Sequence, residues 1–346
     1  MEAIVVETGR LRTHCWVWGP EDGIPVLLVH GNLVSGWFWR AVAEQLPATA
    51  RVVAPDLRGF GRTEALEIDA TRGLRDWSDD LAALVEALGW TGSARVHAAG
   101  WSLGGGALQQ YAIDHPADLA SLVLVAPLSP YGFGGTKDAA GTVAHEDGAG
   151  SGAGSVNPDF VRRIAQGDTS ADEPTSSPRA VMGSFFWSPK FTLPDEEELL
   201  GEVLRTRTGE GFYPGDATPS EHWPGTAPGR RGVANAMSPI YCDTSAIADL
   251  DPRVPILWVR GDEDQVVSDT SLFDLATLGQ LGAVPGWPGL DVLPPQPMLQ
   301  QTRAVLERFA AGGGRYREVV LEGHGHGPVV ECPERVAELL RELMGA

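Results

Sequence analysis

The sequence predicts an α/β protein in which helices cover both faces of a mostly parallel sheet. Two observations support this fold class. Short apolar runs alternate with segments of helical periodicity over the first 130 residues, and the alternation returns after residue 250. In addition, residues 25–30 (PVLLVH) form a continuous apolar run, which is typical of a strand that is buried on both faces.

The expected elements can be placed in chain order. Residues 3–7 and 13–18 are expected to form a pair of strands around the turn at Thr8-Gly9-Arg10. Every later strand is a short apolar run, and every helix carries apolar residues at helical spacing. Further strands are expected at 25–30, 51–54, 94–99, 119–126, 254–259 and 316–321. Further helices are expected at 37–46, 73–88, 103–114, 298–310 and 333–343.

The alternation stops at Pro127, where the chain becomes rich in glycine and proline. We therefore expect a discontinuous α/β core, residues 1–128 and 251–346, interrupted by an inserted cap at residues 129–250. Helical patterns return inside the cap at 158–166 and 195–206.

A second segment rich in glycine and proline lies inside the core at residues 278–297. We expect an extra loop there, because this composition disfavours regular structure. Its apolar residues are too numerous for a fully solvated loop. The loop is therefore expected to pack against the cap or against the second protomer of a homo-oligomer, and to help wall a substrate pocket. These apolar residues are Leu281, Val284, Trp287, Leu290, Val292 and Leu293.

Composition and charge exclude several classes of function. The chain has 46 acidic and 26 basic residues, so its formal net charge is −20, which disfavours binding to a phosphate backbone. No apolar run approaches the roughly 20 residues that a membrane helix needs, and no signal peptide is recognisable at the N-terminus. Three cysteines, Cys15, Cys242 and Cys332, are far apart in the sequence. We expect a cytoplasmic protein with no nucleic-acid or membrane partner.

The strongest motif is G-x-S-x-G at residues 100–104 (GWSLG), between an expected strand and an expected helix. A turn this tight strains the central residue, and the glycines remove the Cβ atoms that would clash. The Ser102 hydroxyl would then stand above the carboxyl edge of the sheet, where the helix N-terminus stabilises negative charge. The alternative is a purely structural glycine-rich turn. A nucleotide loop is excluded, since G-x-G-x-x-G and a following Lys-Ser/Thr are missing.

Two more segments follow buried strands, residues 29–33 (VHGNL) and 56–63 (DLRGFGRT). Together with the turn at Ser102, they resemble the α/β-hydrolase superfamily in their order and spacing. The resemblance covers about residues 25–128 and 252–344, and it implies a cap-bearing α/β-hydrolase fold. It also implies an oxyanion hole made of the backbone N–H groups of Asn32 and Leu103, with His30 in a structural role.

The resemblance also supplies a base and an acid, which a nucleophilic serine needs. The family's G-H-x-P-x-x-E-x-P-E pattern aligns on His326, with His324 as the alternative. The family's G-x-x-D-x-x-V pattern selects Asp264, which leaves Asp262 and Glu263 as loop carboxylates. The order Ser102, Asp264, His326 is that of the superfamily. The His-x-His pair has no third metal ligand nearby, so neither a metal nor another cofactor is expected.

The nucleophile also separates branches of the family. The sequence HGN at residues 30–32 and the aromatic residues 37–39 are similar to haloalkane dehalogenases, but those enzymes have an aspartate where this chain has Ser102. Serine favours an acyl-enzyme, so the resemblance implies an esterase or lactonase acting on a small molecule with a bulky apolar part. Leu33, Trp101, Phe186, Trp187 and Trp223 are the residues expected to bind it. Seven aromatic residues of the cap either line the pocket or form the cap's own core: Phe185, Phe186, Trp187, Phe191, Phe212, Tyr213 and Trp223.

Two other functions stay open at this point. The same triad also serves hydrolases that cleave a C–C bond in a diketone and iminopeptidases that remove an N-terminal proline. The second alternative, from a different class, is a ligand-binding receptor that keeps the hydrolase site but turns over very slowly.

Overall fold

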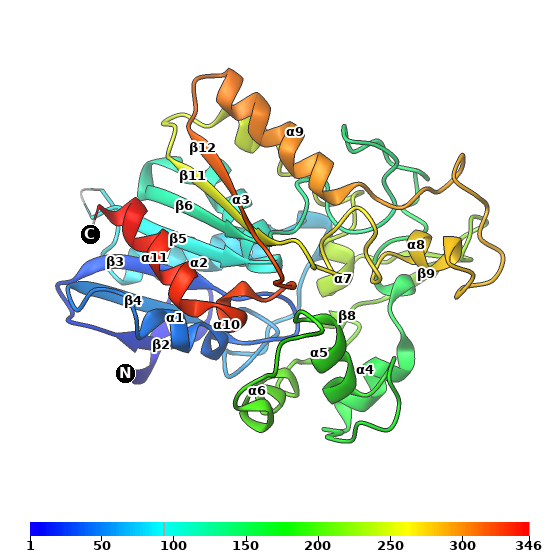
Figure 1. Ribbon diagram of the computed structural model, residues 1–346, viewed down its shortest axis with the longest axis horizontal. Helices are drawn as coiled ribbons and strands as arrows, with labels where there is room; N and C mark the ends of the chain where they lie inside the picture. The colour runs from blue at the N-terminus through cyan, green and yellow to red at the C-terminus, as the bar shows by residue number, and fades with distance from the viewer. Residues whose placement is uncertain (93, 346) are drawn as a thin grey trace.

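The computed structural model describes residues 1–92 and 94–345. Residues 93 and 346, which fall within the two predicted core ranges, lie outside the described residues. The centre of the molecule is an eight-stranded sheet (Figure 1). Its strands, in spatial order, are β1 (Glu2–Glu7), β2 (Arg12–Trp18), β4 (Ala50–Pro55), β3 (Ile24–Val29), β5 (Val96–Trp101), β6 (Leu119–Val125), β11 (Ile256–Gly261) and β12 (Tyr316–Leu321).

The sheet is parallel from β4 to β12, while β2 runs antiparallel to both of its neighbours. Strand β3 lies between β4 and β5, and its residues Val26, Leu27, Leu28 and Val29 have no solvent exposure. This burial explains why the run is apolar without alternation. The predicted α/β class with a mostly parallel sheet is therefore confirmed.

Helices cover both faces of the sheet (Figure 1). Helices α1 (Arg40–Ala43) and α11 (Pro333–Met344) pack together on one face, whereas α2 (Arg75–Ala87) and α3 (Leu103–Asp114) pack together on the other. Helix α9 (Met298–Ala311) leads into β12, the last strand. On α11, residues Val336, Ala337, Leu339 and Leu340 are fully buried, at the spacing expected of one helix face.

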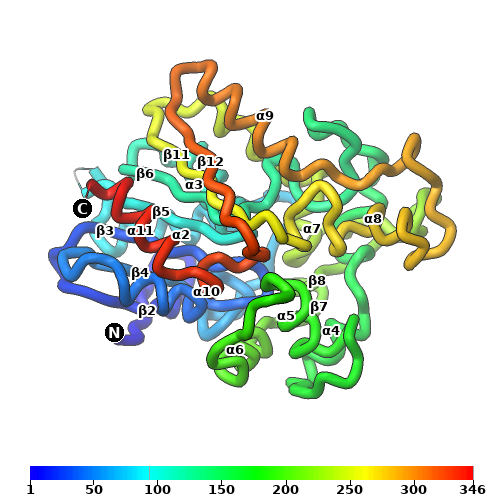
Figure 2. Tube along the Cα trace, viewed as in Figure 1, coloured from blue at the N-terminus to red at the C-terminus, as the bar shows by residue number. Residues whose placement is uncertain are grey.

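The residues between β6 and β11 form a separate region beside the carboxyl ends of the strands, drawn from green to yellow in Figure 2. Here the described residues contain four α-helices and two small two-stranded sheets, but no strand of the central sheet. The helices are α4 (Pro158–Ala165), α5 (Pro178–Phe185), α6 (Glu196–Val203) and α7 (Val233–Ala236). The paired strands are β7 (Thr208–Gly209) with β8 (Tyr213–Pro214), and β9 (Ala217–Pro219) with β10 (Thr226–Pro228).

The segment at residues 278–297 differs from the expected loop in two respects. Its first residues belong to a helix, α8 (Leu275–Gln280), which begins at the side-chain cap of Asp274. In addition, Leu281, Leu290 and Val292 are exposed, whereas the Trp287 indole packs on Gly279 of the same segment. Of the six apolar residues named above for this segment, only Leu293 is fully buried.

The same segment packs against the inserted residues. The indole Nε1 of Trp223 donates a hydrogen bond to the Pro285 oxygen at 2.9 Å, and Leu293 lies against Gly150. Gln296 accepts a hydrogen bond from the backbone N–H of Gly134. The expected contact between this loop and residues 129–250 is therefore present.

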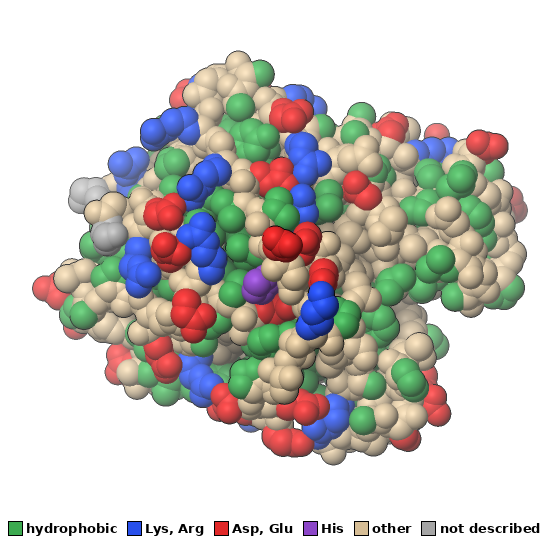
Figure 3. Space-filling model, in the orientation of Figure 1, with side chains coloured by type: hydrophobic (Ala, Val, Ile, Leu, Met, Phe, Trp, Pro, Cys, Tyr) green, Lys and Arg blue, Asp and Glu red, His purple; other side chains and the backbone are tan. Residues whose placement is uncertain are grey.

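Acidic and basic side chains are interspersed over the face shown in Figure 3. Many of them form surface ion pairs, such as Arg317 with Glu342 at 2.6 Å. Within residues 1–92 and 94–345, none of the helices combines the length and apolarity that a bilayer crossing requires.

Candidate active site

Ser102 occupies a strained turn between β5 and α3. Its backbone has φ 56° and ψ −119°, which a residue with a side chain rarely adopts. A side chain on Gly100 would collide with the backbone oxygen of Gly104, and one on Gly104 would collide with the oxygens of Val29 and His30. Glycine at both positions therefore lets the chain turn sharply enough to present the Ser102 hydroxyl, in the geometry that the G-x-S-x-G pattern predicts.

His326 and Asp264 lie on the loops after β12 and β11, and the fold brings them into contact. The His326 Nδ1 and the Asp264 Oδ2 are 2.9 Å apart, and both side chains are buried. The backbone N–H groups of Val266 and Val267 donate to the other carboxylate oxygen at 2.7 and 2.9 Å. Because a carboxylate oxygen accepts hydrogen bonds, the contact with Asp264 favours the tautomer in which His326 Nδ1 carries the ring proton, which leaves Nε2 as the nitrogen able to accept one.

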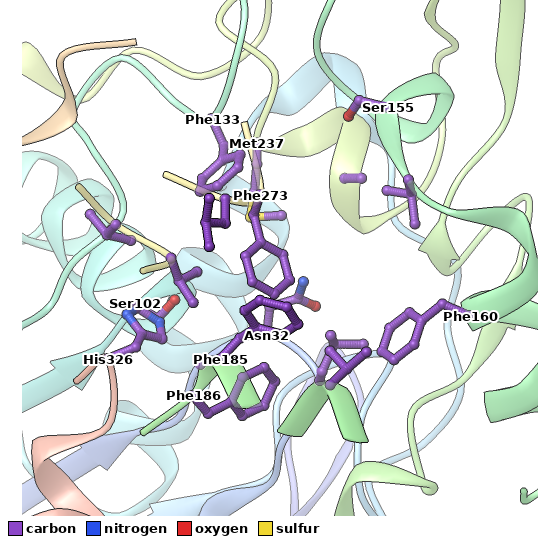
Figure 4. Close-up of a pocket in the computed structure, with 18 of the residues that line it drawn as sticks. Asn32, Ser102, Phe133, Ser155, Phe160, Phe185, Phe186, Met237, Phe273 and His326 are labelled. Carbon is purple, nitrogen blue, oxygen red and sulfur yellow. The ribbon is translucent and has the colours of Figure 1, made fainter. Parts of the chain in front are cut away.

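Figure 4 shows the Ser102 hydroxyl beside the His326 ring, and both residues line one cavity. The alternative base, His324, instead places its Nδ1 2.8 Å from the backbone oxygen of Glu322. The neighbouring carboxylates are also engaged elsewhere. Asp262 accepts the N–H of Gly323 at 2.7 Å, and Glu263 accepts the hydroxyl of Ser188 at 2.6 Å.

The loop after β3 lies directly against the turn at Ser102. A Cβ on Gly31 would lie only 3.1 Å from the Cβ of Ser102, and Asn32, the next residue, lines the same cavity as Ser102. Leu103 is the first residue of α3, and its helix end has no side-chain cap. His30 holds the loop, since its Nε2 accepts the N–H of Leu57 at 2.8 Å and its Nδ1 lies 2.7 Å from the Gly31 oxygen. Burial lowers the pKa of His30, which is consistent with a structural role.

Glu331 connects the loop at His326 to the inserted region. Its carboxylate accepts the N–H of Gly325 at 2.9 Å and that of Ser188 at 2.8 Å. Burial raises the pKa of this carboxyl group, while the hydrogen bonds oppose that shift. The indole of Trp101 adds a further constraint on the same loop, because it donates to the His326 backbone oxygen at 2.7 Å.

The cavity beside Ser102 has a volume of about 390 Å³. Its described wall holds no Asp, Glu, Lys or Arg side chain, and five phenylalanines contribute to it. Three of the predicted binding residues, Leu33, Trp101 and Phe186, lie on the wall. Residues that sequence reasoning did not single out also line it: Phe133, Phe160, Val181, Met237, Val266, Val267 and Phe273. Phe160 and Val181 are buried positions of amphipathic helices, a signal that does not distinguish a pocket wall from a core.

The two other predicted binding residues, Trp187 and Trp223, do not lie on the wall, so this prediction is corrected. The Trp187 indole packs against Gly327 and stacks on Trp101 at 6.4 Å between ring centroids, while the Trp187 backbone lies against Gly325. Trp223 is directed toward the loop at Pro285. Of the seven aromatic residues singled out in the insertion, Phe185, Phe186 and Tyr213 line the cavity.

Comparison with known proteins establishes the family. The sequence profile described as alpha/beta hydrolase fold matches residues 24–284, which is more than half of the chain. The chain belongs to the α/β-hydrolase family. The resemblance inferred from its motifs is thereby confirmed.

Individual proteins match this chain over shorter segments. The chain is 36% identical to a non-heme chloroperoxidase of Streptomyces lividans over 115 residues, which are 33% of this chain and 40% of that protein. It is 36% identical to the pimeloyl-[acyl-carrier protein] methyl ester esterase of Aeromonas salmonicida over 106 residues, 30% of this chain and 38% of that protein. The chain thus matches about two fifths of the length of these relatives.

The esterase RhEst1 from Rhodococcus sp. ECU1013 has a similar structure. Its TM-score is 0.61 at 20% identity, and the alignment covers 100% of this chain and 99% of that one. This likeness concerns the fold.

Within the described part of the chain, no three His, Cys, Asp or Glu side chains gather as a metal-binding group.

Proposed function

We propose that this α/β-hydrolase is a serine hydrolase that cleaves neutral carboxylic esters or lactones with a bulky apolar part. The observation that carries the proposal is the position of the Asp264–His326 pair beside the strained Ser102, at one end of a cavity lined by phenylalanines. A buried carboxylate paired with an imidazole is the arrangement that activates a serine.

In the proposed reaction, the Ser102 Oγ attacks the ester carbonyl carbon while His326 Nε2 takes the hydroxyl proton. The negative charge that develops on the carbonyl oxygen is stabilised by the backbone N–H groups of Asn32 and Leu103. The C–O bond then breaks, and His326 returns the proton to the leaving alcohol. The acyl group stays on Ser102. Asp264 orients the imidazole and stabilises its charged form, and it keeps its own negative charge throughout.

Water completes the cycle. His326 removes a proton from a water molecule, whose oxygen attacks the acyl carbon, and the bond to Ser102 breaks as the proton returns to its oxygen. The products are a carboxylic acid and an alcohol, or a hydroxy acid when the substrate is a lactone. Each step uses the same base and the same oxyanion donors.

We also propose that residues 129–250 act as a cap over this site. Phe160 of α4 and Phe185 of α5 support this, because both project into the cavity in Figure 4. An uncharged aromatic wall favours an apolar, uncharged substrate, since a buried charge without a partner is unfavourable.

Hydrolysis of a panel of neutral p-nitrophenyl and aryl-acetic esters tests the proposal. Wild-type protein is expected to cleave esters with bulky apolar acyl groups, and Ser102→Ala is expected to retain less than about one per cent of this activity. A diketone and an N-terminal prolyl peptide belong in the same panel. Cleavage of either one in preference to every ester would replace the ester proposal, and tight binding without turnover would favour a receptor.

A further inference from the structure

Ser188 is a buried residue of the inserted region that contacts the loops of both Asp264 and His326. It is only 2% exposed, and it is not among the residues that line the described cavity. Its hydroxyl donates a hydrogen bond to Glu263 Oε2 at 2.6 Å, and its backbone N–H donates to Glu331 Oε2 at 2.8 Å. One residue of the inserted region thus bridges two loops of the core.

Both hydrogen bonds lead to a position next to the Asp264–His326 pair. Glu263 directly precedes Asp264 in the chain. Glu331 in turn accepts the N–H of Gly325 at 2.9 Å, and Gly325 directly precedes His326. The loop at Asp264 is therefore attached to the inserted region through one hydrogen bond, and the loop at His326 through two.

The loop at His326 is intrinsically flexible, because every second residue from 323 to 327 is glycine. A Cβ on Gly325 would lie 2.5 Å from the backbone nitrogen of Ser188, so glycine allows the inserted region to approach this closely. The close contact in turn restricts the loop. The inserted region thereby supplies a rigidity that the sequence of the loop does not provide by itself.

The two residues before Ser188 connect this bridge to the substrate cavity. Phe186 lies on the cavity wall (Figure 4). Trp187 stacks on Trp101, and the Trp101 indole donates to the backbone oxygen of His326 at 2.7 Å. One short stretch of chain therefore carries a wall residue, a residue that packs beside the base and the residue that bridges the two loops.

We propose that Ser188 is a positioning residue, which holds the loops of Asp264 and His326 in the geometry that proton transfer requires. This inference rests on the proposed function and gives the inserted region a part in the chemical step as well as in substrate binding. The reacting groups of a site must be held within about 0.5 Å of their productive geometry. A misplacement of about 1 Å can lower the rate by about 10²-fold.

Other contacts of Glu263 set the size of the expected effect. Its backbone N–H donates to the His324 oxygen at 2.9 Å, so the two loops are also joined directly. Lys190 contacts the Glu263 carboxylate at 3.3 Å, but its side chain is 83% exposed, and an exposed ion pair contributes little. Loss of the Ser188 hydroxyl should therefore loosen the pair without separating it, and we expect a loss of about tenfold in rate.

The variant Ser188→Ala removes the hydroxyl and keeps the backbone N–H. We expect its kcat to fall about tenfold, equally for p-nitrophenyl acetate and for a bulky neutral ester, with KM unchanged. The reason is that positioning acts on the chemical step, which both esters share, and not on the cavity wall.

Glu263→Ala breaks the same hydrogen bond from the other side, and it provides the test if Ser188→Ala does not fold. If the hydroxyl acts through Glu263, the double variant should lose no more activity than either single variant.

Ser220→Ala is the matched control. The Ser220 hydroxyl also donates to a carboxylate of the inserted region, Asp147 Oδ2, at 2.6 Å. Neither residue lines the described cavity. The kcat of this variant is therefore expected to equal that of the wild type.

Proton NMR provides a measurement that does not depend on turnover. The Nδ1 proton of His326, 2.9 Å from Asp264 between the heavy atoms, should resonate far downfield of the amide protons in the wild type. Ser188→Ala should broaden or shift this resonance because the pair is held less firmly, and Ser220→Ala should leave it unchanged.

The other outcomes also decide the proposal. A loss confined to the bulky ester would mean that Ser188 supports only the cavity wall, which would overturn the positioning role. An unchanged kcat with an unchanged Nδ1 resonance in folded Ser188→Ala, or additive losses in the double variant, would overturn it as well. If the wild type cleaves no ester, the proposed function fails, and the resonance alone then decides whether Ser188 positions the pair.

Discussion

At the scale of single residues, the contact between Asp264 and His326 governs the expected chemistry. Asp264→Asn should lower kcat by up to about 10⁴-fold, because an amide at this position stabilises the wrong imidazole tautomer. Asp262→Asn should have a far smaller effect, because that carboxylate accepts a backbone N–H from Gly323 and does not contact the base. Steady-state kinetics on one ester would compare kcat in the two variants. A larger loss of kcat in Asp262→Asn than in Asp264→Asn would move the catalytic acid to Asp262.

The two histidines of the same loop provide a second comparison. His326→Ala is expected to be inactive, whereas His324→Ala should only be impaired, since the His324 ring contacts a backbone oxygen outside the cavity. Single-turnover measurements with a chromogenic ester would show whether the acylation step is lost. Full acylation in His326→Ala would contradict the assignment of the base.

Asp274 is a buried carboxyl group that the proposed reaction does not use. Burial raises the pKa of Asp274 from 3.8 to about 6 in the folded protein. Its contribution to stability is therefore greatest below its ordinary pKa, and it is lost as the pH rises through about 6. The stability of the wild type relative to Asp274→Asn should accordingly fall between about pH 4 and pH 7. Urea unfolding at several pH values would measure the difference in the free energy of unfolding between the two proteins. A difference that does not change with pH would show that the carboxyl is already ionised.

At the scale of elements, helix α6 attaches the inserted region to the core through one buried carboxylate. Glu202 accepts two hydrogen bonds from the Arg62 guanidinium, at 2.7 and 2.9 Å, and one from the Ser35 hydroxyl at 2.7 Å. Glu202→Ala should lower the free energy of unfolding by roughly 2 kcal/mol, because it leaves polar groups without a partner.

Glu198, on the same helix, is the matched control. It is about half exposed and contacts Arg40 at 3.2 Å, so Glu198→Ala should change stability by less than about 1 kcal/mol. Chemical denaturation of the three proteins measures both effects. Equal losses for the two variants would show that the Glu202 network does not hold α6 in place.

The core elements were predictable from the sequence because their signals are local. The apolar run of β3, the glycines around Ser102 and the amphipathic pattern of α11 each follow from short stretches of chain. The inserted region was harder to predict. Helix α5 begins at Pro178 within a run of polar residues, and it was missed although proline is favoured in the first turn of a helix. Helix α8 was missed because it adjoins a glycine- and proline-rich segment.

The site residues also divide into those that a local sequence signal predicts and those that no such signal predicts. Ser102, Asp264 and His326 lie in motifs of fixed spacing that follow strand ends, and parallel strands bring such ends to one edge of the sheet. The cavity wall has no such signal, because an aromatic side chain in the insertion packs equally well on a pocket or on the core. Trp187 illustrates this, since only the tertiary structure places its indole against Gly327.

At the scale of the whole molecule, the net charge of −20 has consequences for stability and for substrates. Mutual repulsion of the excess carboxylates destabilises the compact state, and salt screens it over a Debye length of about 10 Å at 0.1 M. The melting temperature should therefore rise as NaCl is increased from about 10 mM to about 150 mM. Differential scanning fluorimetry measures this shift, and a melting temperature that falls with salt would show that the surface ion pairs outweigh the repulsion.

Charge should also govern which esters the molecule accepts. A neutral ester is expected to have a higher kcat/KM than an isosteric ester with a carboxylate in its acyl group, because both the net charge and the uncharged wall disfavour the anion. If the uncharged cavity wall contributes more to this preference than the net charge does, the preference for the neutral ester persists in high salt, because buried interactions are poorly screened. A preference for the anionic ester would contradict this picture of the cavity.

The nucleophile can be tested most directly by covalent labelling. Incubation with a fluorophosphonate, followed by peptide mass spectrometry, identifies the residue that attacks an activated phosphorus centre. We expect one label per chain, on Ser102, formed rapidly in the wild type and lost in Ser102→Ala. Labelling of another residue, or none at Ser102 in folded protein, would contradict it.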